Sequence, residues 1–380
     1  VLRDRHGTPE FGEWGEHARY EPAAVTAMAT PDTTDYEDLR FHWFVQFHLH
    51  RQLTTAADYV RGLGLALKGD LPIGVAPESV EVWTQPELFH EGTQTGAPPD
   101  DFSTRGQNWG FPTYDWTRMA EDGFAWWRAR FRAFAEYVDA YRIDHVLGFF
   151  RIWEIPAGGQ YGIEGHFRPS LPLSAGEIHA ALPDADLAAL TRPVIADGAL
   201  EDDPLAPSAD TAPDALLFEI DGGHVPSIAW RQSGHYLALP EDQQAAFDAL
   251  ALDFFHRRHE GQWEAQGRTT LPAIVGATDL LACGEDLGMV PDIVPRFMNE
   301  MGMLSLEIER MPKRLGEWIA DPAAAPYLSV VSPGTHDTST LRQWWAEDGA
   351  RTSRYWREAL GRVGEPPEAA DGSVILEILE

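Results

Sequence analysis

Three acidic segments of the sequence each follow an apolar stretch and carry residue types that can do chemistry. They are Arg142-Ile143-Asp144-His145, Gly284-Glu285-Asp286-Leu287-Gly288 and Thr335-His336-Asp337-Thr338. Transfer of a glycosyl group with retention needs two carboxyl groups about 5–5.5 Å apart, one as nucleophile and one as acid and then base. A lone Asp after a strand is usually an ordinary cap or surface group. Three such segments in this order, two of them with a neighbouring His, favour one site built from Asp144, Glu285 and Asp337.

The neighbours of these acids fit two different protonation states. Arg142 stands two residues before Asp144, so on a β-strand both side chains point to the same face. The positive charge of Arg142 then favours an ionised Asp144. A Glu held close to other carboxylates binds its proton more tightly, which suits Glu285 to act as an acid.

The elements that must position these acids alternate along the chain. Apolar patterns and Gly or Pro boundaries predict helices at residues 41–67, 122–140, 241–267 and 291–301 and a helix from residue 339. They predict strands at residues 71–75, 141–144, 280–284, 304–308 and 327–331. Strands that alternate with helices favour a parallel α/β sheet. Polar residues just after the strands are typical of a (β/α)8 (TIM) barrel, where that rim carries the active site.

The middle of the chain differs in composition from the two flanking parts. From residue 158 to about residue 242 it is rich in Gly, Pro, Ala and Asp, which indicates an insertion subdomain or long excursion with loops. We therefore predict a first barrel part at 1–157, which includes a loop covering the substrate. An insertion at 158–270 and a second barrel part at 271–380 follow, so the insertion separates strands 4 and 5.

The charge balance and cysteine count narrow the partners and the compartment. The formal charge is −31, from 60 acidic and 29 basic groups, so nucleic acid and anionic membrane surfaces are disfavoured, whereas a neutral sugar is not. No apolar run reaches the roughly 18 residues of a membrane span. The single cysteine, Cys283, fits a reducing cytoplasm. The motifs give no reason to expect a metal or an organic cofactor.

Further motifs surround the three acids. They are Tyr141-Arg142-Ile143-Asp144-His145, Gly148-Phe149, Trp153-Glu154-Ile155-Pro156, Gly96-Ala97-Pro98-Pro99-Asp100, Gly106-Gln107-Asn108-Trp109-Gly110 with Pro112, Gly69-Asp70-Leu71-Pro72-Ile73, Glu285-Asp286-Leu287-Gly288 and His336-Asp337-Thr338. Together, from about residue 40 to residue 345, they resemble the 4-α-glucanotransferases (amylomaltases, disproportionating enzymes) of glycoside hydrolase family 77. The combination is specific, although any one motif alone would be weak.

The resemblance implies a (β/α)8 barrel and a role for each acid. It places residues 70–75 on the third barrel strand and the acids after the fourth, fifth and seventh strands. Asp144 would attack the anomeric carbon and form a covalent glucosyl-enzyme. Glu285 would protonate the leaving glycosidic oxygen and then deprotonate the incoming 4-hydroxyl. Asp337, with His336 beside it, would hold the 2- and 3-hydroxyls of the distorted sugar.

The remaining expected site residues would bind sugar or orient the acids. By the same resemblance, Arg142 orients Asp144 and His145 contacts a hydroxyl. A Gly-rich loop would lie over the glucan, with Trp109 offering a flat apolar face to a sugar ring. The other expected substrate-binding residues are Gln107 and Asp100 in this loop and Asp70 at the third strand.

Two departures from the compact members of the family refine the expectation. Asp144 and Glu285 are 141 positions apart, and this long spacing resembles the plant cytosolic type and its bacterial relatives. That type implies maltose and malto-oligosaccharides as donors and glycogen-like or heteroglycan acceptors. The first two barrel strands should precede residue 1 and the eighth should follow residue 380. We therefore expect a barrel that is incomplete at both ends and a longer natural protein.

Two other functions remain open from the sequence. An α-glucan hydrolase would use the same three carboxylates, and only the family resemblance favours a transferase over it. A non-catalytic, truncated glucan-binding protein would bind without turnover, which the three intact acids disfavour. The oligomeric state has no signature in the sequence.

Overall fold

The computed structural model describes residues 1–100, 103–192, 215–314 and 316–379. By their internal contacts, residues 1–140 and 147–280 form one unit, and residues 141–146 and 281–380 form a second. Part of the predicted insertion, residues 193–214, lies outside the described residues. The predicted boundaries of the insertion at residues 158 and 270 stay predictions.

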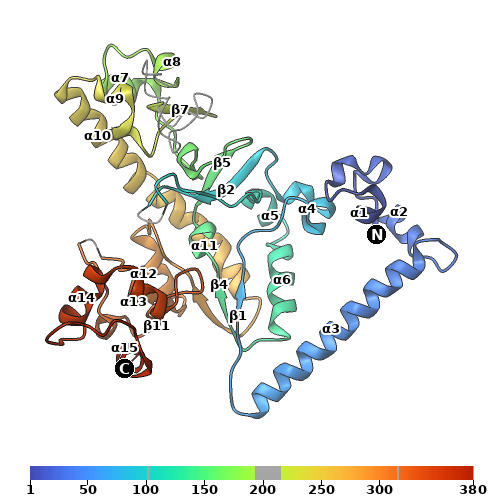
Figure 1. The fold of residues 1–380 in the computed structure, drawn as a ribbon. Coiled ribbons are helices and arrows are strands. Elements are labelled where there is room, and N and C mark those ends of the chain that lie inside the picture. The colour runs from blue at the N-terminus through green and yellow to red at the C-terminus, as the bar shows by residue number, and fades with distance from the viewer. Residues whose placement is uncertain (101–102, 193–214, 315, 380) are drawn as a thin grey trace. The chain divides into compact units, whose positions relative to one another are not determined.

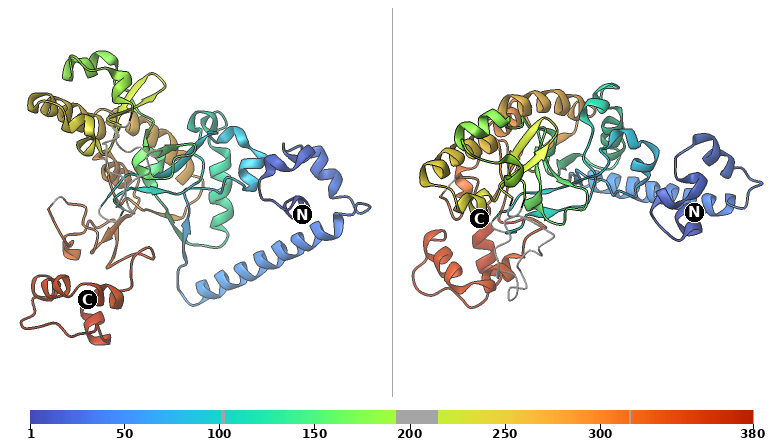
Figure 2. Two further views of the ribbon diagram at one scale, coloured as in Figure 1. Left: turned by 45° about the horizontal axis from the view of Figure 1, so that its top comes forward. Right: turned by 90° about the horizontal axis from the view of Figure 1, so that it is seen from above.

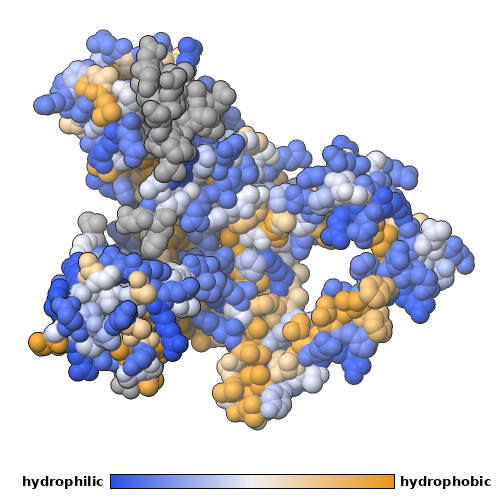
Figure 3. Space-filling model, viewed as in Figure 1, coloured by the Kyte–Doolittle hydropathy of each residue, from blue (hydrophilic) through white to orange (hydrophobic). Residues whose placement is uncertain are grey.

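The first unit begins with helices. They are α1 (Leu2–His6), α2 (Pro22–Met28) and the 27-residue α3 (Tyr36–Gly62). Helix α3 confirms the helix predicted at residues 41–67, although it starts and ends five residues earlier. Apolar side chains stay exposed along it, and Figure 3 shows orange atoms along this helix. The exposed large apolar residues include Phe41, Trp43, Phe44, Phe47 and Leu53. Its only buried residue is Ala57.

The strand predicted at residues 71–75 is wrong in position. Strand β1 covers Lys68–Leu71, and the chain leaves the extended ladder at Pro72. Proline lacks an amide hydrogen and cannot donate to a neighbouring strand, which accounts for the end of β1 at Leu71. Asp70 thus lies within the strand. Helix α4 (Val80–Thr84) follows, with the Ser79 hydroxyl accepting a hydrogen bond from the amide of Val82.

An antiparallel sheet that the sequence did not predict follows in the same unit. Its strands are β2 (Thr93–Ala97), β3 (Gln107–Asn108), β5 (Ile152–Pro156) and β6 (His166–Arg168), in the order β3-β2-β5-β6. Thr95 lies opposite Glu154, and Trp153 lies opposite Phe167. The Trp153 and Ile155 side chains are buried, so the quoted Trp-Glu-Ile-Pro motif is a core strand.

An aromatic core holds the helices that follow this sheet's first strands. Helices α5 (Trp116–Ala120) and α6 (Ala125–Ala135) contribute to it. The buried rings of Trp127 and Phe149 have centroids 5.0 Å apart. The helix predicted at residues 122–140 is therefore confirmed in type but shorter. The Asp122 carboxylate accepts a hydrogen bond from the amide of Ala125 at its start.

The described part of the predicted insertion contains helices and a hairpin. The elements are α7 (Ala175–Ala181), α8 (Leu187–Leu190), β7 (Leu217–Ile220), β8 (Gly223–Pro226) and α9 (Gly234–Leu237). The single helix predicted at residues 241–267 is two helices, α10 (Glu241–His256) and α11 (Glu260–Val275) (Figures 1 and 2). Between them, the buried His259 accepts a hydrogen bond of 3.0 Å from the Leu171 amide at Nδ1. This inward-facing contact coincides with the break.

The second unit is built from strands joined by helices. Its elements are β4 (Ala140–Ile143, whose first residue belongs to the first unit), β9 (Leu281–Gly284), α12 (Ile293–Glu300), β10 (Ser305–Ile308), β11 (Ser329–Ser332), α13 (Leu341–Glu347), α14 (Gly349–Glu358) and α15 (Gly372–Leu379). Strands β4 and β9 are neighbours, and β10 and β11 pair in parallel. A parallel bridge also joins Cys283 to Leu304. The α/β class is therefore confirmed, and the strands predicted in this region are confirmed within two residues.

Short 3-10 helices complete the described secondary structure. They cover Phe11–Glu13, Gly15–His17, Pro86–Leu88, Val146–Phe149, Gly162–Glu164, Trp230–Gln232 and Pro322–Ala324. In the described ranges, no helix has both the length and the apolar composition that crossing a membrane requires.

Candidate active site

Strand β4 brings Arg142 and Asp144 together at its carboxyl end. Arg142 and its strand neighbours Tyr141 and Ile143 are buried, and Asp144 is the first residue after the strand. The Arg142 Nη1 donates to Asp144 Oδ1 over 2.9 Å, with the Arg142 side chain 11% exposed and that of Asp144 38% exposed. The two-residue spacing therefore puts both side chains on one face. A nearly buried cation at this distance favours the ionised form of Asp144.

Strand β9 places Glu285 beside this pair. The Glu285 amide donates to the Ile143 carbonyl over 2.9 Å, and the Val146 amide donates to the Glu285 carbonyl over 3.0 Å. The side-chain carboxyl accepts at both oxygens, from the His145 amide at Oε2 and from the Leu287 amide at Oε1, each over 2.9 Å. Because main chain and side chain are both tied, the carboxyl group has a fixed position.

The environment of Glu285 favours its protonated form. Glu285 is 8% exposed, and this burial raises its pKa to about 7, with a smaller contribution from the negative charge of Asp144. The Leu287 amide, the charge of Arg142 and the His145 amide oppose the shift. The desolvation of the charged carboxylate is the larger effect. Near neutral pH this group can therefore supply a proton.

The backbone directly after Asp144 has an unusual conformation. His145 has a φ of 45°, a left-handed conformation that costs a residue with a side chain about 1–3 kcal/mol. In this conformation its amide reaches Glu285. Gly284, directly before Glu285, has no room for a side chain, because an added Cβ would lie 2.7 Å from the Met298 Cε and 3.0 Å from a Val146 methyl.

Asp337 and His336 form a second group after β11. The His336 Nε2 lies 3.4 Å from Asp337 Oδ2, and the Asp337 side chain is 69% exposed. The Asp337 amide donates to the Thr335 hydroxyl over 3.2 Å. The third predicted acid thus lies in the same unit as Asp144 and Glu285. Its carboxylate is exposed to solvent, and the Thr335 hydroxyl holds its backbone amide.

A buried ion pair beside Glu285 was missed by the sequence reasoning. Asp286 is fully buried, and its carboxylate accepts from the Leu306 amide over 3.0 Å and from the Lys313 ammonium over 2.8 Å. Lys313 also binds Glu307 over 2.8 Å. A signal was present, because Lys313 is one of only two lysines in the chain.

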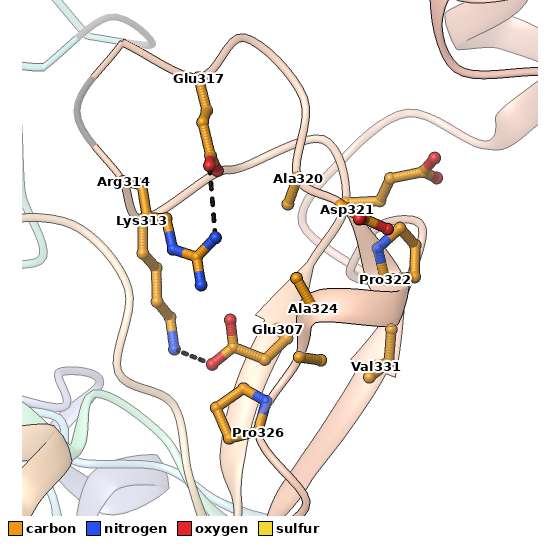
Figure 4. A pocket seen from close by; sticks show the side chains of 12 residues that line it. Glu307, Lys313, Arg314, Glu317, Ala320, Asp321, Pro322, Ala324, Pro326 and Val331 are labelled. Carbon is orange, nitrogen blue, oxygen red and sulfur yellow. Dashed lines mark hydrogen bonds and ion pairs between the residues drawn. The ribbon is translucent and has the colours of Figure 1, made fainter.

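A pocket of about 170 Å³ opens beyond Lys313. Figure 4 shows the Lys313–Glu307 and Arg314–Glu317 pairs along its wall, and Pro322, Pro326 and Val331 also line it. Charged and apolar side chains therefore both line the pocket. Lys313 connects it to Asp286 and, through the chain, to Glu285.

The other predicted residues belong to the first unit. Asp70 lies on β1, and the Asp100 carboxylate accepts from the Ser103 amide over 2.7 Å. The Trp109 indole donates to the Gln107 side chain over 2.9 Å, and its ring stacks on Phe111 with centroids 5.8 Å apart. The predicted site residues thus divide between the units, with these four in the first. Arg142, Asp144, His145, Glu285, His336 and Asp337 are in the second.

Comparisons with known proteins identify relatives of this chain. A family model described as 4-alpha-glucanotransferase (glycoside hydrolase family 77) matches residues 1–379. The 4-alpha-glucanotransferase DPE2 of rice, Oryza sativa subsp. japonica, is 35% identical over 422 aligned residues, covering 96% of this chain and 44% of its own. A 4-alpha-glucanotransferase of Chlamydia pneumoniae is 25% identical over 353 residues, covering 91% of this chain and 48% of its own.

A solved structure resembles the fold as well. The amylomaltase from Streptococcus agalactiae, solved in complex with acarbose, superposes with a TM-score of 0.63 at 21% identity. The match covers 96% of this chain and 56% of that structure. The chain therefore spans about half the length of the relatives that it matches.

Proposed function

The chain belongs to the 4-alpha-glucanotransferase family, glycoside hydrolase family 77, and from that premise we propose that it moves α-1,4-linked glucan units between sugar chains. The donors are maltose and malto-oligosaccharides, and the acceptors are glycogen-like glucans or heteroglycans. The match to the rice enzyme over nearly the whole chain supports the plant cytosolic type. A net charge of −31 presents no barrier to such neutral substrates.

The proposed reaction is a double displacement. Asp144 attacks the anomeric carbon of the donor, while Glu285 protonates the glycosidic oxygen and the leaving sugar departs. Glu285, now a carboxylate, takes the proton from the acceptor 4-hydroxyl, whose oxygen displaces Asp144 from the anomeric carbon. Two displacements retain the α configuration.

The observation that carries this proposal is the contrast between the surroundings of two adjacent acids. Asp144 binds the cation of Arg142, whereas burial holds the pKa of Glu285 at about 7. A nucleophile must be ionised and a general acid must carry a proton, so neighbouring carboxyl groups with separated proton affinities fit the two roles. A purely structural pair of acids would have no need of this difference.

The other site residues bind and orient the sugar in this proposal. Asp337, with His336 beside it, accepts hydrogen bonds from the 2- and 3-hydroxyls of the distorted sugar. Its carboxylate is exposed, which leaves room for that contact. His145 contacts a hydroxyl. Gln107 and Trp109 cover the glucan, and the hydrogen bond between them fixes the indole face on which a sugar ring stacks. Asp70 and Asp100 complete the substrate-binding set.

The proposed architecture is the (β/α)8 barrel with residues 158–270 inserted between strands 4 and 5. The parallel pairing of β10 with β11 and the parallel bridge from Cys283 to Leu304 support it. The acids that follow β4, β9 and β11 would then share the rim where such barrels carry their active sites. A cytoplasmic location, resting on the single Cys283, belongs to the same proposal.

Incubation of the full-length protein with maltotriose tests the activity. Transfer yields glucose and a ladder of longer oligosaccharides, whereas a hydrolase of the same chemistry yields glucose and maltose without a ladder. A non-catalytic glucan-binding protein yields neither. Asp144→Ala should bind glucan and abolish transfer, and a wild-type rate from this variant would refute the assignment of the nucleophile.

A trapping experiment tests the covalent step. With Glu285→Gln, a maltosyl fluoride donor needs no acid to leave, so the first displacement can occur. The second displacement lacks its base and is slow. Intact-protein and peptide mass spectrometry should then find a maltosyl ester on Asp144. An ester on a different residue would refute the proposed assignment.

A further inference from the structure

The loop that carries Asp337 is built to hold its main chain rather than its carboxylate. The Thr338 hydroxyl donates to the Thr335 carbonyl over 2.9 Å and accepts from the Thr335 amide over 3.0 Å. The Ser332 hydroxyl donates to the Gly334 carbonyl over 2.7 Å. Asp337 therefore sits at the tip of a closed turn whose position depends on what anchors residues 333–339.

Arg310, just beyond β10, supplies that anchor. Its Nε donates to the Pro333 carbonyl over 2.6 Å, before the turn. Its Nη2 donates over 3.0 Å to the Thr338 hydroxyl and over 3.0 Å to the Ser339 carbonyl, after the turn. One planar guanidinium thus bridges both ends of the Asp337 loop.

Two neighbours keep the guanidinium in this place. Its carbon lies 5.5 Å from the centroid of the Trp344 ring, a cation–π distance. On the other side Gly334 leaves the space that the guanidinium fills, because a Cβ at residue 334 would lie 1.7 Å from Nη2. The site therefore has the shape of this side chain, with a glycine where any larger residue would push it out.

We propose that Arg310 is a positioning residue for Asp337, fixing the loop so that this carboxylate meets the sugar hydroxyls in the transition state. This inference rests on the proposed function and adds to it a residue that does not itself touch the sugar. The Asp337 side chain is 69% exposed, and its neighbour His336 belongs to the same loop, so the placement of both depends on the loop backbone that Arg310 holds. Lysine cannot replace it, since a single ammonium lacks the planar fork that spans two separated carbonyls.

The test uses Arg310→Met and Arg310→Lys in the full-length protein. A misplacement of about 1 Å of a group that acts in the transition state costs on the order of 100-fold in rate. We therefore expect kcat for maltotriose transfer to fall about 10- to 100-fold in both variants, with KM changed by less than about threefold. Gly334→Ala should show the same split, because its methyl group displaces the guanidinium.

Arg354→Met is the matched control. Arg354 lies in the same unit, binds Glu358 over 2.9 Å and stacks 4.1 Å from the Trp318 centroid, and neither of these partners belongs to the Asp337 loop. Its variant should keep wild-type kcat. A double-mutant cycle with Asp337→Asn adds a second readout. Arg310→Met should lower kcat little further in the Asp337→Asn background, because the carboxylate that Arg310 positions is gone.

Each outcome decides the proposal. Wild-type kcat in Arg310→Met, or a full additive loss in the Asp337→Asn background, would overturn it. Variants of Arg310 that are unfolded at the assay temperature while Arg354→Met is folded would also overturn it, because Arg310 would then be a folding residue. If the wild-type protein itself makes no ladder from maltotriose, it is the proposed function that has failed.

Discussion

Replacing Glu285 with Gln should change the pH dependence of the stability of the protein. Burial raises the pKa of Glu285 from 4.5 to about 7. Each pKa unit corresponds to about 1.4 kcal/mol, so the ionised side chain costs the folded state about 3 kcal/mol. The native state holds this proton more tightly than the unfolded state. Stability from Glu285 is therefore lost as pH rises from about 4.5 through about 7, and the cost is complete above that pH.

The amide variant removes this titration. A Gln side chain cannot accept from both the His145 and the Leu287 amides, which bind separate oxygens of Glu285, so one buried amide is left unpaired at a cost of about 1–3 kcal/mol. That cost does not depend on pH. We therefore expect the free energy of unfolding of Glu285→Gln, relative to wild type, to rise by about 3 kcal/mol between about pH 4 and about pH 8.

Urea unfolding of both full-length proteins across this pH range measures the difference. Glu358→Gln, at a side chain that is 53% exposed, is the control and should show a much flatter difference. A difference for Glu285→Gln that is equally flat would refute the raised pKa. The same group should set the alkaline limb of kcat/KM in the wild type, which should fall above about pH 7 as the general acid loses its proton.

Three further substitutions test the packing around the site by thermal or urea unfolding. Lys313→Met should cost about 3–5 kcal/mol near neutral pH because it leaves the buried Asp286 unpaired, and less at low pH, where Asp286 is protonated; a pH-independent loss would contradict this. Gly284→Ala should cost about 1–3 kcal/mol through overpacking, and an unchanged midpoint would show that the neighbours yield freely. Tyr355→Phe should lower the free energy of unfolding by about 1–3 kcal/mol, because it removes the 2.6 Å hydrogen bond to the buried Glu309. Unchanged stability would contradict this.

The candidate acids were predictable from the sequence because their signal is local. The strands predicted at residues 141–144 and 280–284 correspond to β4 and β9, and an acid directly follows each of these two strands. The two-residue spacing of Arg142 and Asp144 also predicted that their side chains lie on the same side, since alternate residues of a strand share a face. Pro72 could have ended β1 in the same reasoning, because its missing amide hydrogen is a property of the residue alone.

The contacts that set the behaviour of these acids come from residues far apart in the chain. Glu285 and the His145 amide are 140 positions apart, and Asp286 and Lys313 are 27 apart. Arg310 holds Ser339 from 29 positions away. No periodicity or local motif encodes such pairs, because they depend on how strands and loops pack.

The sequence by itself therefore determined which residues could do chemistry, their order and the strands that end at them. The tertiary structure decided the pKa of Glu285, because burial is a property of the packed site and not of the residue. It also decided that Arg310 braces the Asp337 loop, because a guanidinium can join two backbone segments only after folding has brought them within hydrogen-bond distance.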